Sequence, residues 1–309
     1  MNMQPSQISA GQIPAGTVVA PELPDVLPEM KPRRGVIGFL RRYPTIAIGA
    51  ALLLLMLIAA VFAPYLGTVD PTAIATSRRT REPSALYWFG TDMLGRDIYS
   101  RVLYGARVSL IVGFSVAILA SLGGLLVGLI SGFVRVADSL IMRVMDGIMS
   151  IPPILLAVAL MALTRGSVGN VIVAITIAEI PRVSRLVRGV VLSLREQPYV
   201  DAAVAAGTRT PMIILRHILP NTLAPLIVQA TYICASAMIT EAILSFIGAG
   251  TPPITPSWGN IMAEGRALWQ VKFYIVLFPA IFLSLTVLAV NLLGDGLRDA
   301  LDPRMAKAD

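Results

Sequence analysis

Six apolar segments, each long enough to cross a lipid bilayer, constrain the fold of this chain more than any other feature. They cover residues 45–63, 108–133, 144–163, 170–192, 223–247 and 273–293. A membrane-spanning helix needs about 20 predominantly apolar residues. An α-helix also satisfies its own backbone hydrogen bonds, which lipid cannot do. The pattern therefore predicts an all-α membrane protein with six transmembrane helices, in a domain that covers residues 45–300.

Two of these segments contain residues that are unusual in a membrane helix. The third includes Pro152 and Pro153, so we expect a kink there. Such kinks are tolerated in a membrane helix when neighbouring helices satisfy the freed carbonyl groups. The fourth includes Glu179, Pro181 and Arg182, so we expect its second half to emerge into water.

The composition agrees with a membrane protein and gives its orientation. Only 14% of the residues are charged, whereas about a quarter are charged in a soluble protein. The net charge of +7 does not indicate nucleic acid binding, because the basic residues lie at the ends of apolar segments, where they set orientation. With both termini in the cytoplasm, 16 of the 25 basic residues lie inside. This bias predicts cytoplasmic termini and an outside loop over residues 64–107.

The two ends of the chain differ from the rest. Residues 1–44 contain seven prolines and no long apolar run, a composition typical of disordered segments. We therefore expect a disordered cytoplasmic tail over residues 1–44. The first apolar segment begins too late for a cleaved signal peptide. Residues 301–309 are predicted to form a short cytoplasmic tail.

Small residues recur every four positions in the second apolar segment. They are Ala120, Gly124, Gly128 and Gly132. Residues four apart share one face of a helix, and a face of small residues lets another helix approach closely. The stripe therefore predicts close helix packing, either within this chain or against a second subunit.

The sequence lacks the residues that common enzyme sites require. None of its three lysines follows a glycine, so no phosphate-binding Gly-Lys loop is present. His217 is the only histidine and Cys234 the only cysteine, which excludes a Cys/His metal cluster and an intrachain disulfide. A Gly-x-Ser-x-Gly motif is also absent. We expect no catalytic activity, no cofactor and no metal site in this chain.

Two acidic residues, Glu179 and Glu241, lie within or near the predicted membrane region. Ionisable groups there are often functional. Glu179 precedes Arg182 by three positions, so the two can pair on one helix face; contact with a transported substrate is the alternative. Glu241 lies near the outer end of the fifth segment, where it can reach water or a loop amide. Both glutamates are candidates for a translocation path.

A polar segment over residues 195–220 separates the fourth and fifth spans. Its alanines favour a short helix over residues 200–209. Gly207 can end this helix in a left-handed conformation, and Pro211 can open the next one. Alanines expose little bulk, so such a helix fits a groove on a soluble partner. The alternative is an amphipathic connector on the membrane surface, but that needs large apolar residues on one face.

This segment resembles the Glu-Ala-Ala loop of ABC importer permeases. That loop reads Glu-Ala-Ala, three residues, Gly, nine residues and Ile-x-Leu-Pro. Here Asp201 replaces the Glu and His217 the Ile, while the spacing is kept. The resemblance implies a coupling contact with an ATPase through Asp201, Ala202, Ala203, Gly207, Leu219 and Pro220. We expect Arg209, beside them, to pair with acidic residues of that partner.

Further motifs resemble the second permeases of the dipeptide, oligopeptide and nickel group. They are Phe89-Gly90-Thr91-Asp92, Leu94-Gly95-Arg96-Asp97, Ser100-Arg101, residues 104–110, Ser150-Ile151-Pro152, residues 244–248, Ser257-Trp258-Gly259 and residues 294–303. This resemblance covers nearly the whole chain after residue 35. It implies a type I ABC importer fold in the bacterial inner membrane. It also implies a heterodimer with a second permease, two ATPase subunits and an external substrate-binding protein.

We therefore expect the permease subunit of an ATP-driven, binding-protein-dependent importer, with ATP hydrolysis on partner chains. The resemblance favours di- or oligopeptides as substrate and leaves nickel, glutathione and opines open. An ion-coupled secondary transporter is the alternative from a different class. The paired inverted repeats and midplane ion ligands of that class are not visible in the sequence.

Overall fold

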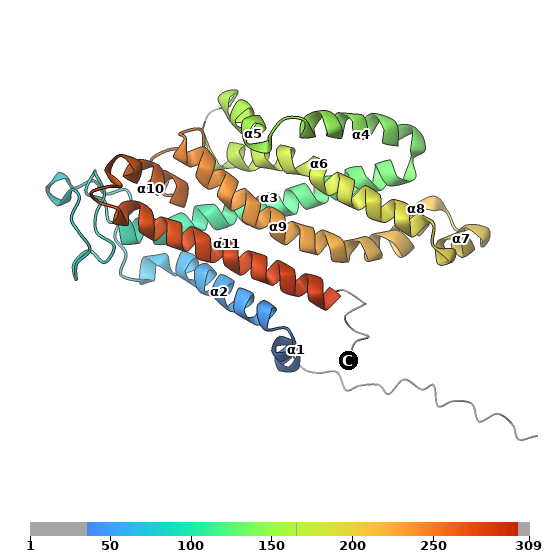
Figure 1. Ribbon diagram of the computed structural model, residues 1–309, viewed down its shortest axis with the longest axis horizontal. Helices are drawn as coiled ribbons and strands as arrows, with labels where there is room; N and C mark the ends of the chain where they lie inside the picture. The colour runs from blue at the N-terminus through green and yellow to red at the C-terminus, as the bar shows by residue number, and fades with distance from the viewer. Residues whose placement is uncertain (1–35, 165, 302–309) are drawn as a thin grey trace, which may run out of the picture.

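The computed structural model describes residues 36–164 and 166–301, which form an elongated bundle of helices (Figure 1). The long helices are α2 (Pro44–Val61), α3 (Ile98–Phe133), α6 (Val168–Arg195), α9 (Leu219–Phe246) and α11 (Tyr274–Leu301). The shorter helices are α1 (Val36–Arg42), α4 (Arg135–Met149), α5 (Pro153–Ala162), α7 (Pro198–Ala205), α8 (Thr210–Ile213) and α10 (Trp258–Gly265). A π-helical turn over Ile214–Ile218 joins α8 to α9. No strand occurs in the two described ranges, and the predicted all-α class is confirmed.

Four helical stretches in the described ranges are long and apolar enough to cross a membrane. They are Pro44–Val61, Ile98–Phe133, Thr210–Phe246 and Tyr274–Leu301. The pair α4 and α5 makes a fifth if it is counted as one span. The remaining predicted span corresponds to α6, a single helix of 28 residues. Composition alone does not identify α6 as a span, because Glu179, Arg182, Arg185 and Arg188 interrupt its apolar sequence.

The expected kink in the third predicted span is a complete break. The helices α4 and α5 are bent by 86° relative to each other. Pro152 between them is extended, with φ −53° and ψ 132°, because a residue before a proline is disfavoured in the helical region. Pro153 then opens α5, where its missing N–H has no helical partner. The predicted third span, residues 144–163, therefore includes only the end of α4, which begins at Arg135.

Helix α3 begins ten residues before the predicted start of the second span. The Asp97 carboxylate caps this start, because its Oδ2 accepts hydrogen bonds from the Ser100 N–H at 2.8 Å and from the Ser100 hydroxyl at 2.5 Å. Arg101 and Arg107, which were placed in the outside loop, therefore lie on α3. The loop ends near Asp97 rather than at residue 107.

The predicted N-terminal tail also extends too far. Residues 36–42 form α1, and α2 begins at Pro44. Residues 1–35 and 302–309, which include most of both predicted tails, lie outside the described residues. The disorder expected for residues 1–35 stays a prediction.

Helices α3 and α6 run side by side through the bundle, and the small-residue stripe lies between them. A Cβ atom added at Gly124 would lie 2.3 Å from the Val183 Cβ, and one at Gly128 would lie 2.6 Å from the Val187 Cβ. At Gly132 it would lie 2.5 Å from Val191 Cγ1. Ala120 is fully buried on the same face. The structure places these four residues at a contact within the chain.

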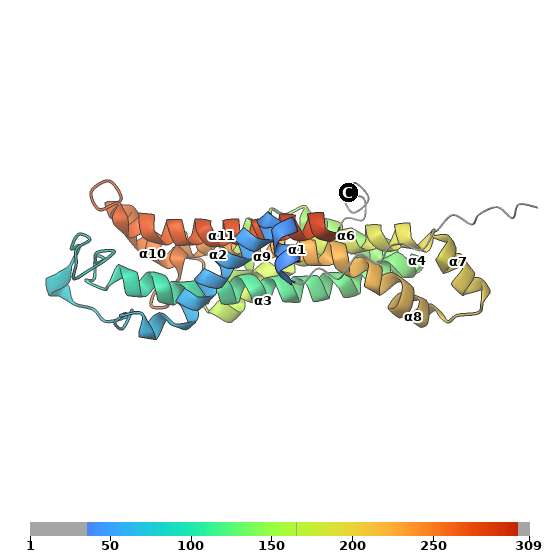
Figure 2. The same ribbon diagram turned by 90° about the horizontal axis from the view of Figure 1, so that it is seen from below.

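The bundle has two distinct ends, and both figures separate them. The helices α7 and α8 lie at one end, whereas the loop before α3 lies with α10 at the other (Figures 1 and 2). Helix α3 has 36 residues, which at 1.5 Å per residue is about 54 Å. The hydrocarbon core of a bilayer is about 30 Å thick. Helix α3 is therefore longer than the hydrocarbon core is thick, and we expect it to extend beyond the lipid.

Candidate functional site

The short helix α7 lies at one end of the bundle and is closed by a defined C-terminal motif. Gly207 has a φ of +77°. The Thr208 N–H donates to the Ala203 carbonyl at 3.0 Å, and the Gly207 N–H donates to the Val204 carbonyl at 2.9 Å. This pair of bonds is the Schellman motif, which ends helices in a left-handed glycine. Pro211 follows in the first turn of α8, as the sequence predicts.

One face of α7 is anchored, and the other is exposed in the part of the chain that the structure describes. Val200, Ile213 and Ile218 are buried beneath it, and the Tyr199 and His217 rings lie 6.2 Å apart. The residues that the sequence assigns to ATPase coupling, on α7 and in the segment from α7 to the start of α9, differ in exposure. The exposed ones are Asp201, Ala202, Gly207, Arg209 and Pro220, and the partly buried ones are Ala203 and Leu219.

The position of Ala203 changes which side chains can meet a partner. Ala203 packs against the hydrophobic core of its own chain, whereas Ala202 points outward. Val204, Ala205 and Ala206 are also exposed. The exposed surface of this stretch is therefore made of Ala202, Val204, Ala205, Ala206 and Gly207. Apart from Val204, which is 58% exposed, these residues present little bulk, so the surface suits insertion into a groove.

The ends of α3 and α6 next to α7 are joined by a cation. The Arg195 guanidinium donates to the Gly132 carbonyl at 2.7 Å and lies 5.3 Å from the centre of the Phe133 ring. This contact satisfies a carbonyl at the C-terminus of α3, where the helix dipole favours a positive charge. The segment that carries α7 is thereby fixed to the longest helix of the bundle.

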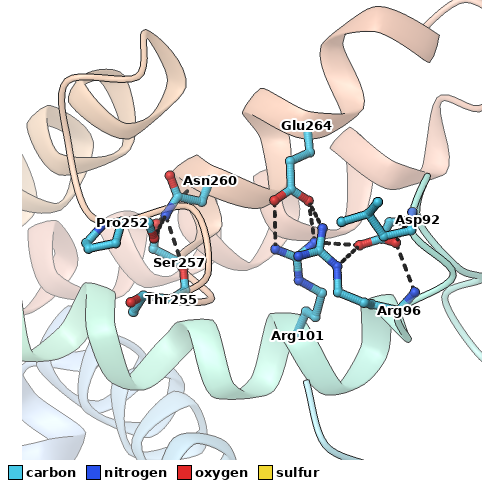
Figure 3. A network of polar contacts seen from close by, with 9 residues as sticks. Asp92, Arg96, Arg101, Pro252, Thr255, Ser257, Asn260 and Glu264 are labelled. Carbon is cyan, nitrogen blue, oxygen red and sulfur yellow. Dashed lines mark hydrogen bonds and ion pairs between the residues drawn. The ribbon is translucent and has the colours of Figure 1, made fainter. Parts of the chain in front are cut away.

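The opposite end holds a buried network of charges (Figure 3). Arg101 donates from Nη1 to Asp92 Oδ2 at 2.6 Å and from Nη2 to Glu264 Oε1 at 3.2 Å. Arg96 donates from Nε to Asp92 Oδ2 at 2.7 Å and also pairs with Glu264. The side chains of Asp92 and Arg101 are both 1% exposed. The network fastens the loop before α3 to α10.

A second group of polar contacts fixes the connection between α9 and α10. The Asn260 amide donates to the carbonyls of Pro252 and Thr255, each at 3.0 Å, and to the Thr251 hydroxyl at 2.9 Å (Figure 3). The indole N–H of Trp258 donates to the Val102 carbonyl at 3.0 Å. The loop is therefore tied to α3 as well as to its own helix.

The two membrane glutamates occupy different surroundings. Glu179 lies 3.2 Å from Arg182, which is the expected pairing. Glu241 does not reach water: its residue is fully buried, and its Oε1 accepts from the Ser245 hydroxyl at 2.8 Å. The loop that follows α9, which the Asn260 amide holds in place, covers Glu241. This cover is not predictable from local sequence, because the loop lies ten or more residues further along the chain.

Glu264 is the residue of the outer network that the sequence reasoning did not single out. Its partners Asp92, Arg96 and Arg101 all belong to the motifs at the start of the second span. The local signal for Glu264 is a single acidic residue in the short segment between the last two apolar spans, and it meets Arg96 and Arg101 only in the folded chain. No local spacing links Glu264 to Arg101, since 163 positions separate them.

The profile of one protein family matches most of this architecture. The family is described as the binding-protein-dependent transport system inner membrane component, and it matches residues 124–307. The chain belongs to this family. The matched range includes every helix from α4 to α11 and the whole segment that carries α7. The site on α7 therefore lies within the region that matches the binding-protein-dependent permeases.

Several similar proteins are described as permeases for peptides or for glutathione. A probable peptide ABC transporter permease, y4tQ of Sinorhizobium fredii, is 52% identical over 87% of this chain and 92% of its own length. The dipeptide permease DppC of Alkalihalophilus pseudofirmus is 41% identical, over 93% of this chain and 94% of its own. The glutathione permease GsiD of Pectobacterium atrosepticum is also 41% identical, over 86% and 89%.

A solved structure supports the fold independently. A chain of the methionine ABC transporter MetNI, in an inward-facing conformation, superposes with a TM-score of 0.54 at 21% identity. The match covers 65% of this chain and 96% of the other. Family and fold together make this chain an inner-membrane permease of a binding-protein-dependent ABC importer, with the type I importer fold.

Proposed function

We propose that this permease imports di- or oligopeptides as one half of a membrane pair with a second, similar permease. Two ATPase subunits would bind at α7, and a substrate-binding protein would deliver peptide at the end that holds α10. ATP hydrolysis takes place on the partner subunits. ATP binding closes the ATPase pair and moves α7, and the bundle then rocks between inward-open and outward-open states.

The observation that carries this proposal is the exposed, rigidly held surface of α7. The small residues of this surface, Ala202, Ala205, Ala206 and the left-handed Gly207, are exposed in the described part of the chain and so add little to its packing. The Schellman motif nevertheless fixes its shape. A defined but uncovered surface at the end of long helices is suited to transmit a movement from another protein. The relatives that are described as peptide permeases support the choice of substrate.

Replacing Ala202 by arginine is expected to abolish transport without preventing membrane insertion. The arginine side chain would occupy the space that a methyl group leaves for the partner, and Ala202 is exposed, so the fold of this chain is not disturbed. We expect dipeptide uptake to fall at least tenfold, and ATP hydrolysis to lose its response to the loaded binding protein. Both are measured on the purified complex in proteoliposomes.

The matched control is Ala202→Ser, which keeps the side chain small and should retain near wild-type uptake. Wild-type transport by the Ala202→Arg complex, with its ATPases still bound, would rule out α7 as the coupling contact. Uptake of glutathione but not of dipeptides by the unmodified complex would keep the importer and change its substrate.

The orientation that we propose places both termini and α7 in the cytoplasm and the loop before α3 outside. Ser77 and Ala206 are both exposed. Ser77 belongs to the loop before α3 and Ala206 follows α7, and these two segments lie at opposite ends of the bundle (Figure 1). A cysteine at residue 77 is expected to react with a membrane-impermeant thiol reagent in cells whose outer membrane has been opened. A cysteine at residue 206 should react only after the inner membrane is opened as well. The native Cys234 is buried and gives little background. The reverse pattern would invert the topology.

A further inference from the structure

A polar hollow lies midway along the bundle, away from α7 and from the outer network. Its volume is about 440 Å³, within the range of about 300–1,000 Å³ that is typical of small-molecule sites. Four helices line it: α5, α6, α9 and α11. The polar side chains on its wall are Glu179, Arg182, Tyr232, Ser236, Thr240 and Asn291.

The ion pair in this hollow is incompletely satisfied. Glu179 is only 3% exposed, yet its Oε2 accepts no hydrogen bond from the described residues. Arg182 Nη1 lies 3.2 Å from this oxygen. The Arg182 side chain itself is 49% exposed. The pair therefore presents one buried oxygen with spare capacity and one guanidinium with most of its donors free.

The depth of the pair decides what can face it. Glu179 is the twelfth of the 28 residues of α6, a helix about 42 Å long. A half-exposed guanidinium at this depth is costly against lipid, and such groups face the interior of a bundle or a water-filled cavity. The hollow is therefore turned toward the aqueous path or the partner permease rather than toward hydrocarbon.

Other groups on the wall can bind polar, uncharged parts of a ligand. The side chains of Ser236 and Asn291 make no hydrogen bond to other described residues. The Tyr232 hydroxyl is already engaged, because it donates to Asp295 Oδ1 at 2.5 Å. An amide and a hydroxyl beside an acid and a guanidinium form a set that matches a short peptide, which has two charged ends and amide groups between them.

We propose that Glu179 and Arg182 form a subsite that carries the charged ends of a peptide through the membrane. The Glu179 carboxylate accepts from the peptide ammonium group, and the Arg182 guanidinium donates to the terminal carboxylate. Peptide binding exchanges one internal ion pair for two pairs with the ligand, so the net charge of the hollow stays zero. This inference rests on the proposed peptide import, and it places a peptide-binding subsite at Glu179 and Arg182 in the translocation path.

The pairing within the empty site has a consequence for transport. Because Glu179 and Arg182 neutralise each other when no peptide is present, the site does not hold a bare charge between cycles. A carrier must bind its substrate strongly enough to admit it and weakly enough to release it, as in ion-conducting sites. Recombination of the internal pair favours release of the peptide.

The test uses the whole transporter with its binding protein in proteoliposomes, and L-alanyl-L-alanine as the probe. We expect Glu179→Gln and Arg182→Gln each to lower dialanine uptake at least tenfold, with ATP hydrolysis stimulated by the loaded binding protein within twofold of wild type. The control is Arg185→Gln on the same helix. Arg185 is 54% exposed and pairs with Asp146 at 2.6 Å, but it does not line the hollow, so its loss should leave uptake within twofold.

A charge exchange separates a peptide subsite from a plain ion pair. The double variant Glu179→Arg with Arg182→Glu restores an internal pair but reverses the positions of the charges. We expect it to assemble and to hydrolyse ATP while uptake stays at least tenfold reduced. Recovery of uptake in the exchanged variant would overturn the subsite, as would wild-type uptake in both single variants. A parallel loss of uptake and of stimulated hydrolysis would assign the pair to assembly and also overturn it. If wild-type transporter fails to import dialanine, the proposed substrate class fails instead.

Discussion

Replacing Arg101 by methionine is expected to destabilise the permease more than any other single change at its outer end. Arg101 is 1% exposed and contacts both Asp92 and Glu264. Methionine fills part of the space but leaves Arg96 alone to pair with the two carboxylates. Removing one partner of a buried ion pair typically costs about 3–5 kcal/mol. We expect a clear fall in the melting temperature of the detergent-solubilised complex, followed by tryptophan fluorescence, and a lower yield from membranes.

The control for this prediction is an ion pair at the surface of the same loop. Lys272 Nζ lies 2.6 Å from Glu82 Oε1, and the Glu82 side chain is 73% exposed. The hydrogen bond from Lys272 lowers the pKa of the Glu82 carboxyl, but water screens the pair. Lys272→Met should therefore leave the melting temperature almost unchanged. Equal effects of Arg101→Met and Lys272→Met would show that the buried network does not hold the outer end together.

The same network explains why the start of α3 was misplaced from sequence. Arg101 and Arg107 resemble loop charges next to an apolar run, so the second span was predicted to begin after them. In the structure each arginine has partners: Arg101 pairs with two carboxylates, although its Nε has no hydrogen bond to a described residue, and Arg107 donates to the Ala60 and Val61 carbonyls at 2.5 Å and 3.0 Å. Charges that find partners can enter a helix, and Glu264, Ala60 and Val61 lie at least 46 positions away in sequence. Hydropathy therefore locates the apolar middle of a span better than its ends.

The segment that carries α7 was predictable to the extent that its signals are local. Gly207 and Pro211 each act through their own backbone, so the end of one helix and the start of the next follow from residue type. Which face of α7 is free did not follow. Val200 and Val204 lie four positions apart on α7, yet only Val200 is buried, so the inner face follows from the packing of Val200 and Ala203 and not from residue type. The sequence names both Ala202 and Ala203 as coupling residues, and the structure shows that Ala202 is the exposed one.

The small-residue stripe gives the prediction with the largest effect on the membrane core. Gly128→Leu is expected to prevent normal folding or assembly, because even the first carbon of the new side chain would lie 2.6 Å from Val187 Cβ and 2.9 Å from the Ser184 carbonyl oxygen. Overpacking of this kind typically costs about 1–3 kcal/mol. Sliding one helix along the other gives no relief, since Gly124 and Gly132 meet Val183 and Val191 in the same way. The measured quantities are the yield of assembled complex and its melting temperature.

Gly189→Leu is the matched control for this change, because Gly189 lies on α6 with no atom within 4 Å of an added Cβ. The same glycine-to-leucine change there adds the same bulk and the same helix propensity without a clash, so assembly should be retained. Gly128→Ala should fall between the two, since its single methyl group meets Val187 but needs a smaller displacement. If Gly128→Leu assembles as well as Gly189→Leu, α3 and α6 do not approach as closely in the membrane as these distances require, and the stripe must be free to face lipid or a second subunit.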